Sequence, residues 1–348
     1  MFPSQNIDEL LNDIRENKAM ALFLGAGTDI TSSYPEGIEF NRLRDRLKED
    51  EKGRSVKLNW ANLLAELIDA ACIDENEAKS LNEMTSSPLK AAILKNRMGD
   101  SYIPIIQSWL YSRCNRRILL KSYASYEQYK NNPSVDNLQK VPFGTLFVIA
   151  DFILNQTSVR AVFTQNYNNF LSETIKILLE KRLDSYCEKR KCLKPFDVYS
   201  GWKDEPYTED CFFIYHVHGF IPPPSEMLPS PENNHIVLSD EEFYQLSQNV
   251  YSWQNASQLH FLTHHTCIIW GLSLDDMTTA RLLRHANLEN NSEKVYWLRG
   301  GLNDGKNDVQ SKLKAEYYES QHLCVVNDED GYCSLYHQIL EELKNKGK

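Results

Sequence analysis

Short apolar runs alternate with longer amphipathic segments along this chain, and the alternation limits the folds open to it. Each apolar run is a continuous stretch of the kind found in strands buried on both faces. Patterns with helical spacing of apolar residues separate most of the runs. Strands joined by helices are typical of a parallel sheet covered on both faces. We therefore predict an α/β fold, a Rossmann-like parallel sheet with helices on both faces. The expected strands are 19–25, 159–166, 211–219, 266–274, 294–300 and 322–328.

A long, mostly helical stretch interrupts the pattern after the first strand. We expect two parts: a Rossmann-like core formed by residues 1–40 and 141–348, and a mostly helical insertion at 41–140. Within the insertion, the polar segment 123–140 is the best candidate for an exposed loop. A second loop, 221–234, is rich in proline and is long enough to cover a site.

Composition narrows the classes of function. The 348-residue chain carries a net charge of −10, which disfavours a surface that neutralises many phosphates, so we expect no direct nucleic-acid binding. It has no apolar run of about 18 residues and no secretory signal pattern, so we expect a cytoplasmic protein without a membrane span. Its eight cysteines include no CxxC pair, which favours reduced thiols over a zinc site.

Four stretches end apolar strands with residues that can do chemistry. They are "GAGTD" at 25–29, "TQNYNN" at 164–169, "HVHG" at 216–219 and "GLSLDD" at 271–276. In an open parallel sheet, ligands bind in the crevice at the carboxyl ends of the strands. The four stretches can therefore converge on one crevice, and this convergence is the main signal for function.

Each stretch taken alone also has an ordinary structural explanation. The first lacks the third glycine of the GxGxxG fingerprint, and small-residue turns after strands are common. Asn166 could cap the next helix or hold a turn through its amide. His218 could be a satisfied histidine at a strand terminus. His216 lies two residues earlier and shares its face if the strand continues, so either histidine could be the chemical one.

Together the four stretches resemble the motifs of the sirtuin superfamily. The stretch at 25–29 looks like the glycine-alanine-glycine phosphate loop, and 164–169 looks like the Thr-Gln-Asn motif. The stretch at 216–219 looks like the His-Gly motif, and 271–274 looks like the Gly-x-Ser motif near the adenosine ribose. Their order along the chain also agrees with the family.

The chain is most similar to the divergent sirtuin-like domains of bacterial anti-phage defence. Its asparagine motif reads Asn-Tyr rather than Asn-Ile, and the segment 239–244, "SDEEFY", follows the His-Gly strand. A "W..LL" helix follows the glycine loop, formed here by Trp60, Leu63 and Leu64.

The resemblance implies an enzyme that uses NAD⁺ as its substrate. We expect an NAD⁺ glycohydrolase (NADase) that cleaves the nicotinamide–ribose bond, gives nicotinamide and ADP-ribose, and depletes NAD⁺ in abortive defence against phage. The chain lacks the four-cysteine zinc module of the deacylases. The resemblance therefore implies no metal and no protein deacylation.

The catalytic residues that the resemblance implies are Asn166 and His218. Cleavage creates an oxocarbenium-like ribose, which needs a fixed water and a proton acceptor. The Asn166 amide can donate to a ribose oxygen and accept from that water. His218 titrates near neutral pH and can take the proton. Because positioning dominates such reactions, we expect Asn166 to matter at least as much as His218.

The remaining site residues would bind the dinucleotide. The amides at 25–27 can approach the pyrophosphate because no large side chain blocks them. Ser273 would hold the adenosine ribose, although it could instead be a helix N-cap, a role equally open to Asp275 and Asp276. The implied binding residues are Gly25, Ala26, Gly27, Thr28, Asp29, Thr164, Gln165, Asn168, Gly271 and Ser273.

Two of these residues depart from the family pattern. Asp29 stands where relatives often have serine or a small residue, and Asn168 stands where many have aspartate. An acid in the glycine loop competes with the pyrophosphate for the same amides unless it points away as an N-cap. We therefore expect a low basal rate that a partner or assembly raises.

The resemblance also implies partners for the chain. They include further copies of itself in a homo-oligomer, or a separate sensor such as a HerA-like ATPase or an Argonaute-like protein. The alternative function is a catalytically weakened nucleotide-binding sensor or a structural subunit of a defence complex.

Overall fold

The computed structural model describes residues 3–29, 60–185, 196–199, 212–226, 236–274, 277–288, 293–300, 308–328 and 332–346. Within these residues one parallel sheet of seven strands runs in the order β3-β4-β2-β1-β5-β6-β7. The strands are β1 (Met20–Leu24), β2 (Val159–Thr164), β3 (Phe196–Tyr199), β4 (Phe212–His216), β5 (Thr266–Trp270), β6 (Val295–Gly300) and β7 (Leu323–Asp328).

Strand β1 lies at the point in the sheet where the order of the strands reverses. Its last residue, Leu24, pairs with Thr164 of β2 on one side and with Trp270 of β5 on the other. The chain therefore extends the sheet to one side through β2 and β4, and to the other side through β5 and β6. Ligand crevices in sheets of this kind form at the carboxyl ends of the strands beside this switch point.

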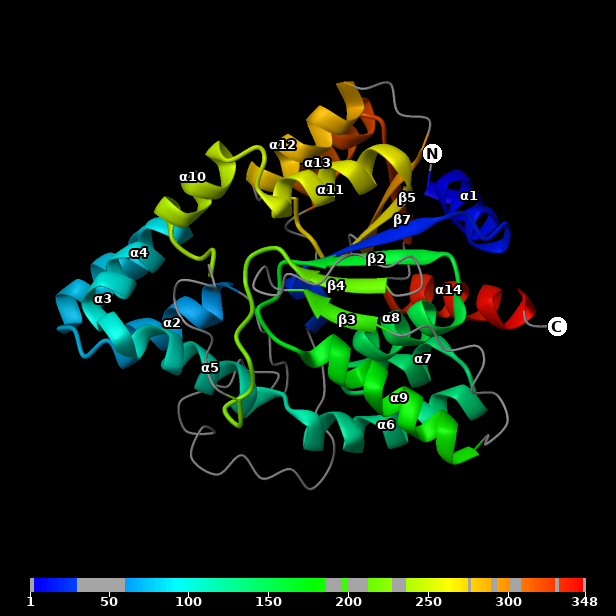
Figure 1. The fold of residues 1–348 in the computed structure, drawn as a ribbon, viewed down its shortest axis with the longest axis horizontal. Coiled ribbons are helices and arrows are strands. Elements are labelled where there is room, and N and C mark those ends of the chain that lie inside the picture. The colour runs from blue at the N-terminus through cyan, green and yellow to red at the C-terminus, as the bar shows by residue number, and fades with distance from the viewer. Residues whose placement is uncertain are drawn as a thin grey trace.

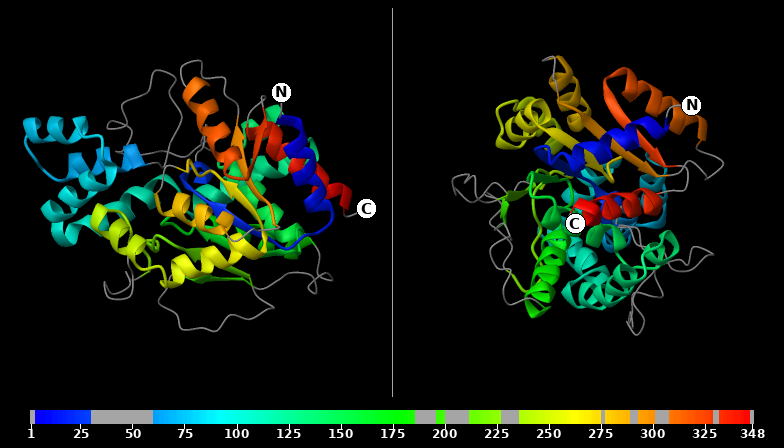
Figure 2. Two further views of the ribbon diagram at one scale, coloured as in Figure 1. Left: turned by 90° about the horizontal axis from the view of Figure 1, so that it is seen from above. Right: turned by 90° about the vertical axis from the view of Figure 1, so that its right-hand side faces the viewer.

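Helices cover both faces of the sheet because successive residues of each strand point to opposite sides. In β1, Leu22 and Leu24 belong to one buried cluster, and Ala21 and Phe23 belong to the other. Figures 1 and 2 show the two helical layers on either side of the sheet. One layer contains α1 (Pro3–Arg15), α8 (Gly144–Asn155), α9 (Phe170–Ser185) and α14 (Tyr332–Lys346). The other contains α11 (Trp253–His264), α12 (Met277–Leu288) and α13 (Asp308–Ser320).

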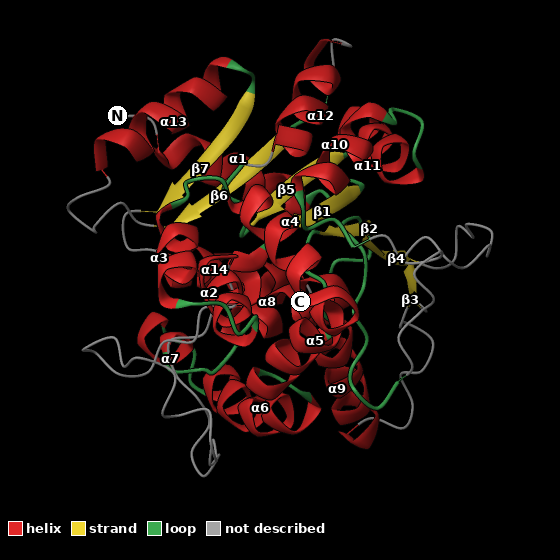
Figure 3. Cartoon of the chain, turned by 90° about the vertical axis from the view of Figure 1, so that its left-hand side faces the viewer, coloured by secondary structure: helices red, strands yellow, loops and turns green. Residues whose placement is uncertain are grey.

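Six α-helices lie in residues 60–139, the part of the chain before α8 that the structure describes. They are α2 (Trp60–Ala70), α3 (Glu75–Glu83), α4 (Ser87–Met98), α5 (Tyr102–Arg113), α6 (Arg116–Asn131) and α7 (Val135–Gln139). The first four gather at one end of the sheet, where α10 (Asp240–Gln248) packs against α4 (Figures 1 and 3). In contrast, α6 packs on α8 and α9, and α7 packs on α14. Part of the predicted insertion thus contributes to the helical layer under the sheet.

The expectation of an exposed loop at 123–140 is wrong. This segment forms most of α6 and all of α7. Tyr126 and Tyr129 are buried there, and the Tyr126 hydroxyl donates to the Asp151 carboxylate at 2.7 Å. The segment looks polar in sequence, but tyrosine rings fill a core when their hydroxyl groups find partners.

The predicted fold class is confirmed by the parallel sheet and its two helical layers. Six strands were expected at the places where the structure has them, and β3 was missed. None of the helices in the described part of the chain is long and apolar enough to cross a membrane.

Candidate functional site

The predicted catalytic asparagine lies at a small polar pocket at the carboxyl ends of β1, β2 and β4. The pocket encloses about 10 Å³, close to the least that holds one water molecule. Most of its lining residues are polar, and they come from three separate parts of the sequence. The lining residues are Leu24, Thr28, Asp29, Thr164, Asn166, Asn168, Leu171, Ser172, Ile214 and His216.

The side chain of Asn166 is fixed by the glycine turn, residues 25–29. Its amide nitrogen donates to the Gly25 carbonyl at 3.2 Å and to the Thr28 hydroxyl at 3.0 Å. The backbone N–H of Asn166 donates to the Thr164 hydroxyl at 3.1 Å. An amide nitrogen has two protons, and these contacts share them with the hydrogen bond that Asn166 makes to the Asp29 carboxylate. The oxygen Oδ1 is the atom of this amide that remains to accept from a water or a sugar hydroxyl.

The glycines after β1 are needed for close packing against the loop after β5. A Cβ atom on Gly27 would lie 2.8 Å from both the Cα and the carbonyl oxygen of Gly271. Gly271 itself has a φ of +69°, and a Cβ there would lie 2.6 Å from the Thr28 nitrogen. Two backbones can approach this closely only where both residues are glycine.

Three backbone amides of this turn already have acceptors. Gly25 donates to the Trp270 carbonyl at 3.1 Å, Gly27 to the Gly271 carbonyl at 2.9 Å, and Thr28 to the Gly25 carbonyl at 3.0 Å. The expected role of the Gly25 and Gly27 amides on a pyrophosphate therefore requires these bonds to be exchanged. In this conformation the turn is bonded to its own protein.

Asp29 is a buried residue of the pocket lining and is hydrogen-bonded to the asparagine motif. Its carboxylate accepts from the Asn168 amide at 2.7 Å and from the Thr28 hydroxyl at 3.1 Å. Burial raises the pKa of Asp29 to about 6, although hydrogen bonds from Asn168, Thr28 and Asn166 oppose that shift. Asp29 and Asn168, the two residues that depart from the family pattern, thus contact each other. Asn168 also accepts from the Phe170 N–H at 3.0 Å, which caps the start of α9.

His216 is the histidine that contacts the asparagine motif. Its Nδ1 lies 2.8 Å from the Asn166 carbonyl oxygen. Since a carbonyl can only accept, Nδ1 carries the proton of the neutral ring. Burial lowers the pKa of His216 to about 4, and the hydrogen bond to Asn166 opposes that shift. The ring is therefore neutral at pH 7.

His218 does not share the surroundings of His216. Strand β4 ends at His216, and the chain turns through Gly219, whose φ is +91°. The His218 ring is buried and stands edge-on to Phe243, with ring centroids 5.3 Å apart. A shared face is expected only if the strand continues past His216, and this condition is not met because β4 ends there.

The other predicted binding residues do not line the pocket. Gln165 donates through its side chain to Thr279 of α12 at 2.7 Å, which attaches the asparagine motif to that helix. Ser273 is exposed, in a loop that Trp297 holds through the Leu272 carbonyl at 3.0 Å. Asp275 and Asp276 lie outside the described residues. Ala26 lies in the glycine turn at the start of a short 3₁₀ helix.

Sequence reasoning missed two neighbours of Asn168, Leu171 and Ser172, which line the pocket from the first turn of α9. The sequence could have indicated them, because residues at the start of a helix after a strand face the same crevice as the strand end.

The described residues contain no candidate metal site. Among the described residues no three His, Cys, Asp or Glu side chains are grouped so that they could hold a metal ion.

A larger cavity of about 790 Å³ has Asn169, the last residue of the asparagine loop (residues 164–169), in its lining. It is lined by α5, by the first turns of α6 and α9, and by residues 223–226. Arg116 and Arg117 line it together with Glu173 and Glu226. The lining therefore favours neither an anion nor a cation.

A comparison with known proteins matches the part of the chain that contains most of the candidate site residues after β1. No curated protein sequence matches the chain. The family model described as the SIR2-like domain matches residues 160–325. SIR2-like domains use NAD⁺, and the matched region contains the asparagine and His-Gly motifs and Ser273, whereas the glycine turn precedes it. The match supports a sirtuin-like domain that extends from β2 into β7.

Proposed function

We propose that this chain is an NAD⁺ glycohydrolase that cleaves the nicotinamide–ribose bond of NAD⁺ to give nicotinamide and ADP-ribose. One observation carries the proposal. In a sirtuin-like domain, the Asn166 amide is held with Oδ1 as its remaining acceptor, beside a pocket close to the size of one water molecule. Such an arrangement suits a reaction in which water must be held beside a sugar carbon.

The bonds that change are few. The C1′–N bond to nicotinamide breaks, and its electron pair leaves with the neutral nicotinamide. The water oxygen forms the new bond to C1′ and gives up one proton. Because the pocket of about 10 Å³ is far smaller than NAD⁺, the dinucleotide lies outside it and the pocket supplies polar atoms beneath the sugar. Asn166 Oδ1 would accept from the water and orient its lone pair toward C1′.

We assign the two histidines different roles. A general base works best when its pKa is near the operating pH, and burial lowers the pKa of His216 to about 4. His216 instead holds the asparagine loop through its contact with the Asn166 carbonyl. His218 belongs to the His-Gly motif that the resemblance assigns to proton transfer, and we propose it as the proton acceptor.

Nicotinamide release from NAD⁺ tests these roles. Asn166→Ala should lower kcat by at least about 100-fold if it positions water and sugar, and His218→Ala by about 100-fold or more if it is the base. His216→Asn keeps a donor near the position of Nδ1 and removes Nε2, so it should retain most activity. If His216→Asn is as inactive as Asn166→Ala while His218→Ala is active, the two histidine roles are reversed.

The same proposal includes regulation and a biological role. Because three amides of the glycine turn are bonded to protein carbonyls, we propose that a partner or assembly rearranges this turn and so raises the rate. The partner would be a further copy of the chain or a sensor such as a HerA-like ATPase. Depletion of cellular NAD⁺ during phage infection would be the outcome.

A second candidate, a nucleotide-binding subunit without catalysis, is favoured by the same bonded turn and by the buried Asp29 carboxylate. Binding of ADP-ribose without any release of nicotinamide, in the presence of all native partners, would favour it over hydrolysis.

A further inference from the structure

Two loops carry the proposed chemistry, and helix α5 contacts both of them. The asparagine loop, residues 164–169, carries Asn166. The histidine loop, residues 217–222, carries His218. The loops are joined where the Ile221 N–H donates to the Tyr167 carbonyl at 2.7 Å. Their relative position therefore sets the distance between the asparagine and the histidine.

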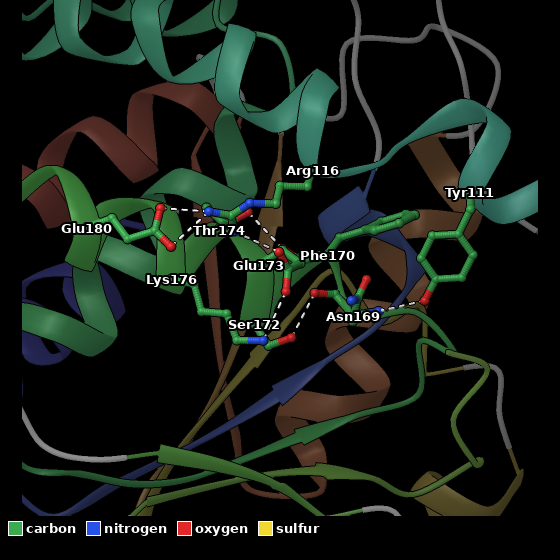
Figure 4. A network of polar contacts seen from close by, with 9 residues as sticks. All are labelled: Tyr111, Arg116, Asn169, Phe170, Ser172, Glu173, Thr174, Lys176 and Glu180. Carbon is green, nitrogen blue, oxygen red and sulfur yellow. Dashed lines mark hydrogen bonds and ion pairs between the residues drawn. The ribbon is translucent and has the colours of Figure 1, made fainter. Parts of the chain in front are cut away.

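The hydroxyl of Tyr111, near the end of α5, lies between the two loops. It donates to the Ile221 carbonyl at 2.7 Å and accepts from the Asn169 N–H at 3.3 Å. Figure 4 shows the tyrosine directed at Asn169, beside Phe170. A hydroxyl has one proton and two lone pairs, so it can make both bonds at once.

The surroundings of Tyr111 fix this bridge. Its ring is buried and stands edge-on to Phe170, with centroids 5.6 Å apart and an interplanar angle of 84°. Burial raises the pKa of Tyr111 well above its usual value, so the hydroxyl keeps its proton. One turn earlier on α5, the Gln107 side chain donates to the Pro222 carbonyl at 2.8 Å. Helix α5 thus holds two consecutive residues of the histidine loop.

We infer that Tyr111 is a positioning residue for the proposed cleavage of NAD⁺, because its hydroxyl joins the loop of Asn166 to the loop of His218. The inference rests on the proposed function. It gives the helices between β1 and α8 a defined task, since α5 supplies the bridge. A displacement of about 1 Å between reacting groups lowers rates by about 100-fold, so loss of the bridge should reach the chemistry.

The test compares Tyr111→Phe with two control variants. Tyr102 is on the same helix, is equally buried, and its hydroxyl has no hydrogen-bond partner among the described residues, so Tyr102→Phe removes an atom that bridges nothing. Arg116 holds α9 through ion pairs to Glu173 at 2.9 Å and Glu180 at 2.6 Å without contacting either loop, so Arg116→Gln tests the attachment of α9 alone (Figure 4). Thermal unfolding of each variant shows whether it is folded.

Two measurements are made on the full chain with NAD⁺ as the probe. Hydrogen exchange at the Asn169 amide should become faster in Tyr111→Phe and stay unchanged in both controls. The kcat for nicotinamide release should fall about 10-fold or more in Tyr111→Phe, with KM within about two-fold, because the bridge acts on the transition state rather than on binding. If Tyr111→Phe does not fold, Gln107→Leu removes the other α5 contact with the histidine loop and should lower kcat in the same direction.

The outcomes separate the inference from the proposed function. Faster exchange with unchanged kcat overturns the inference, because Tyr111 would then be structural only. Unchanged exchange overturns it too, since the hydroxyl would not hold the loop. If the wild-type chain releases no nicotinamide even with its native partners, the proposed function fails, and the exchange data alone decide whether Tyr111 joins the loops.

Discussion

At the scale of single residues, the contact between Asp29 and Asn168 is the feature that sequence could not foretell. The two positions are 139 residues apart and each looks like an isolated departure from a family pattern. In the structure a buried carboxylate accepts from a buried amide at 2.7 Å. The Asp29 carboxylate thus has a hydrogen-bond partner within the site and is buried from solvent. Neither of its hydrogen bonds to Thr28 and Asn168 caps an α-helix of the described residues.

Asp29 should make the stability of the protein depend on pH. Its pKa is raised from 3.8 to about 6 in the folded chain, so the folded state holds more protons than the unfolded state between about pH 4 and 6. Stability from this group is therefore lost as pH rises through that window, by up to about 3 kcal/mol. Asp29→Asn should remove the loss, so the variant gains stability over the wild type between pH 4 and 7 in denaturant unfolding.

The stability of Asp29→Asn is compared with that of the wild type because the pKa of His216 shifts in the opposite direction to that of Asp29. Its pKa is lowered to about 4, so its contribution to stability falls as pH drops below about 6.5. Both proteins contain His216, and its effect cancels in the difference between them. Parallel stability curves for wild type and Asp29→Asn would contradict the burial of an ionisable carboxylate at this place.

A second-site change serves as the control. Asn168→Asp alone would place two carboxylates in contact and should lower the unfolding free energy at pH 8, because two buried like charges cannot both ionise freely. Adding Asp29→Asn restores one acid and one amide, and stability should recover. Additive effects of the two changes would mean that the residues do not act as a pair.

At the scale of secondary-structure elements, the strand ends and the loops between them determine the site. Most strands and helices could be predicted because continuous apolar strands and helical periodicity are local signals. The edge strand β3 has four residues and was missed, since so short a stretch carries little pattern. Whether His216 or His218 contacts Asn166 depended on where β4 ends, and turn geometry after a strand is set by tertiary contacts.

The packing of the glycine turn against the loop after β5 gives a prediction at this scale. Gly27→Ala should destabilise the protein by about 1–3 kcal/mol, because the new Cβ overlaps backbone atoms of Gly271 rather than the end of a flexible side chain. Gly144→Ala is the matched control. Its Cβ would lie 3.3 Å from its nearest neighbours, so its effect should be smaller. Equal melting temperatures for Gly27→Ala and the wild type would contradict the close approach of the two loops.

At the scale of the whole molecule, the site is assembled from regions far apart in the chain. The glycine turn precedes the helices of residues 60–139, whereas the asparagine and histidine loops follow them. Helix α5 contacts both of those loops through Tyr111, and α10 brings Phe243 to His218. Sequence motifs identified the members of the site, but their mutual contacts depend on this long-range packing.

A bonded glycine turn should leave the isolated chain slow. We expect the purified protein to release nicotinamide at below about 0.1 s⁻¹, against about 10 s⁻¹ for a typical enzyme, and to speed up when its native partner is added or when it assembles. Single-turnover assays together with light scattering would relate rate to assembly. Turnover near 10 s⁻¹ from the purified chain as a monomer would rule out the gating.

The most direct measurement is a crystal structure of the chain with ADP-ribose, the product of the proposed reaction. We predict that the C1′ hydroxyl of the terminal ribose lies within hydrogen-bond distance of Asn166 Oδ1, with His218 on the same side of the sugar. A ribose bound elsewhere, for instance in the 790 Å³ cavity beside α5, with Asn166 still enclosed by Gly25 and Thr28, would contradict the assignment of this site.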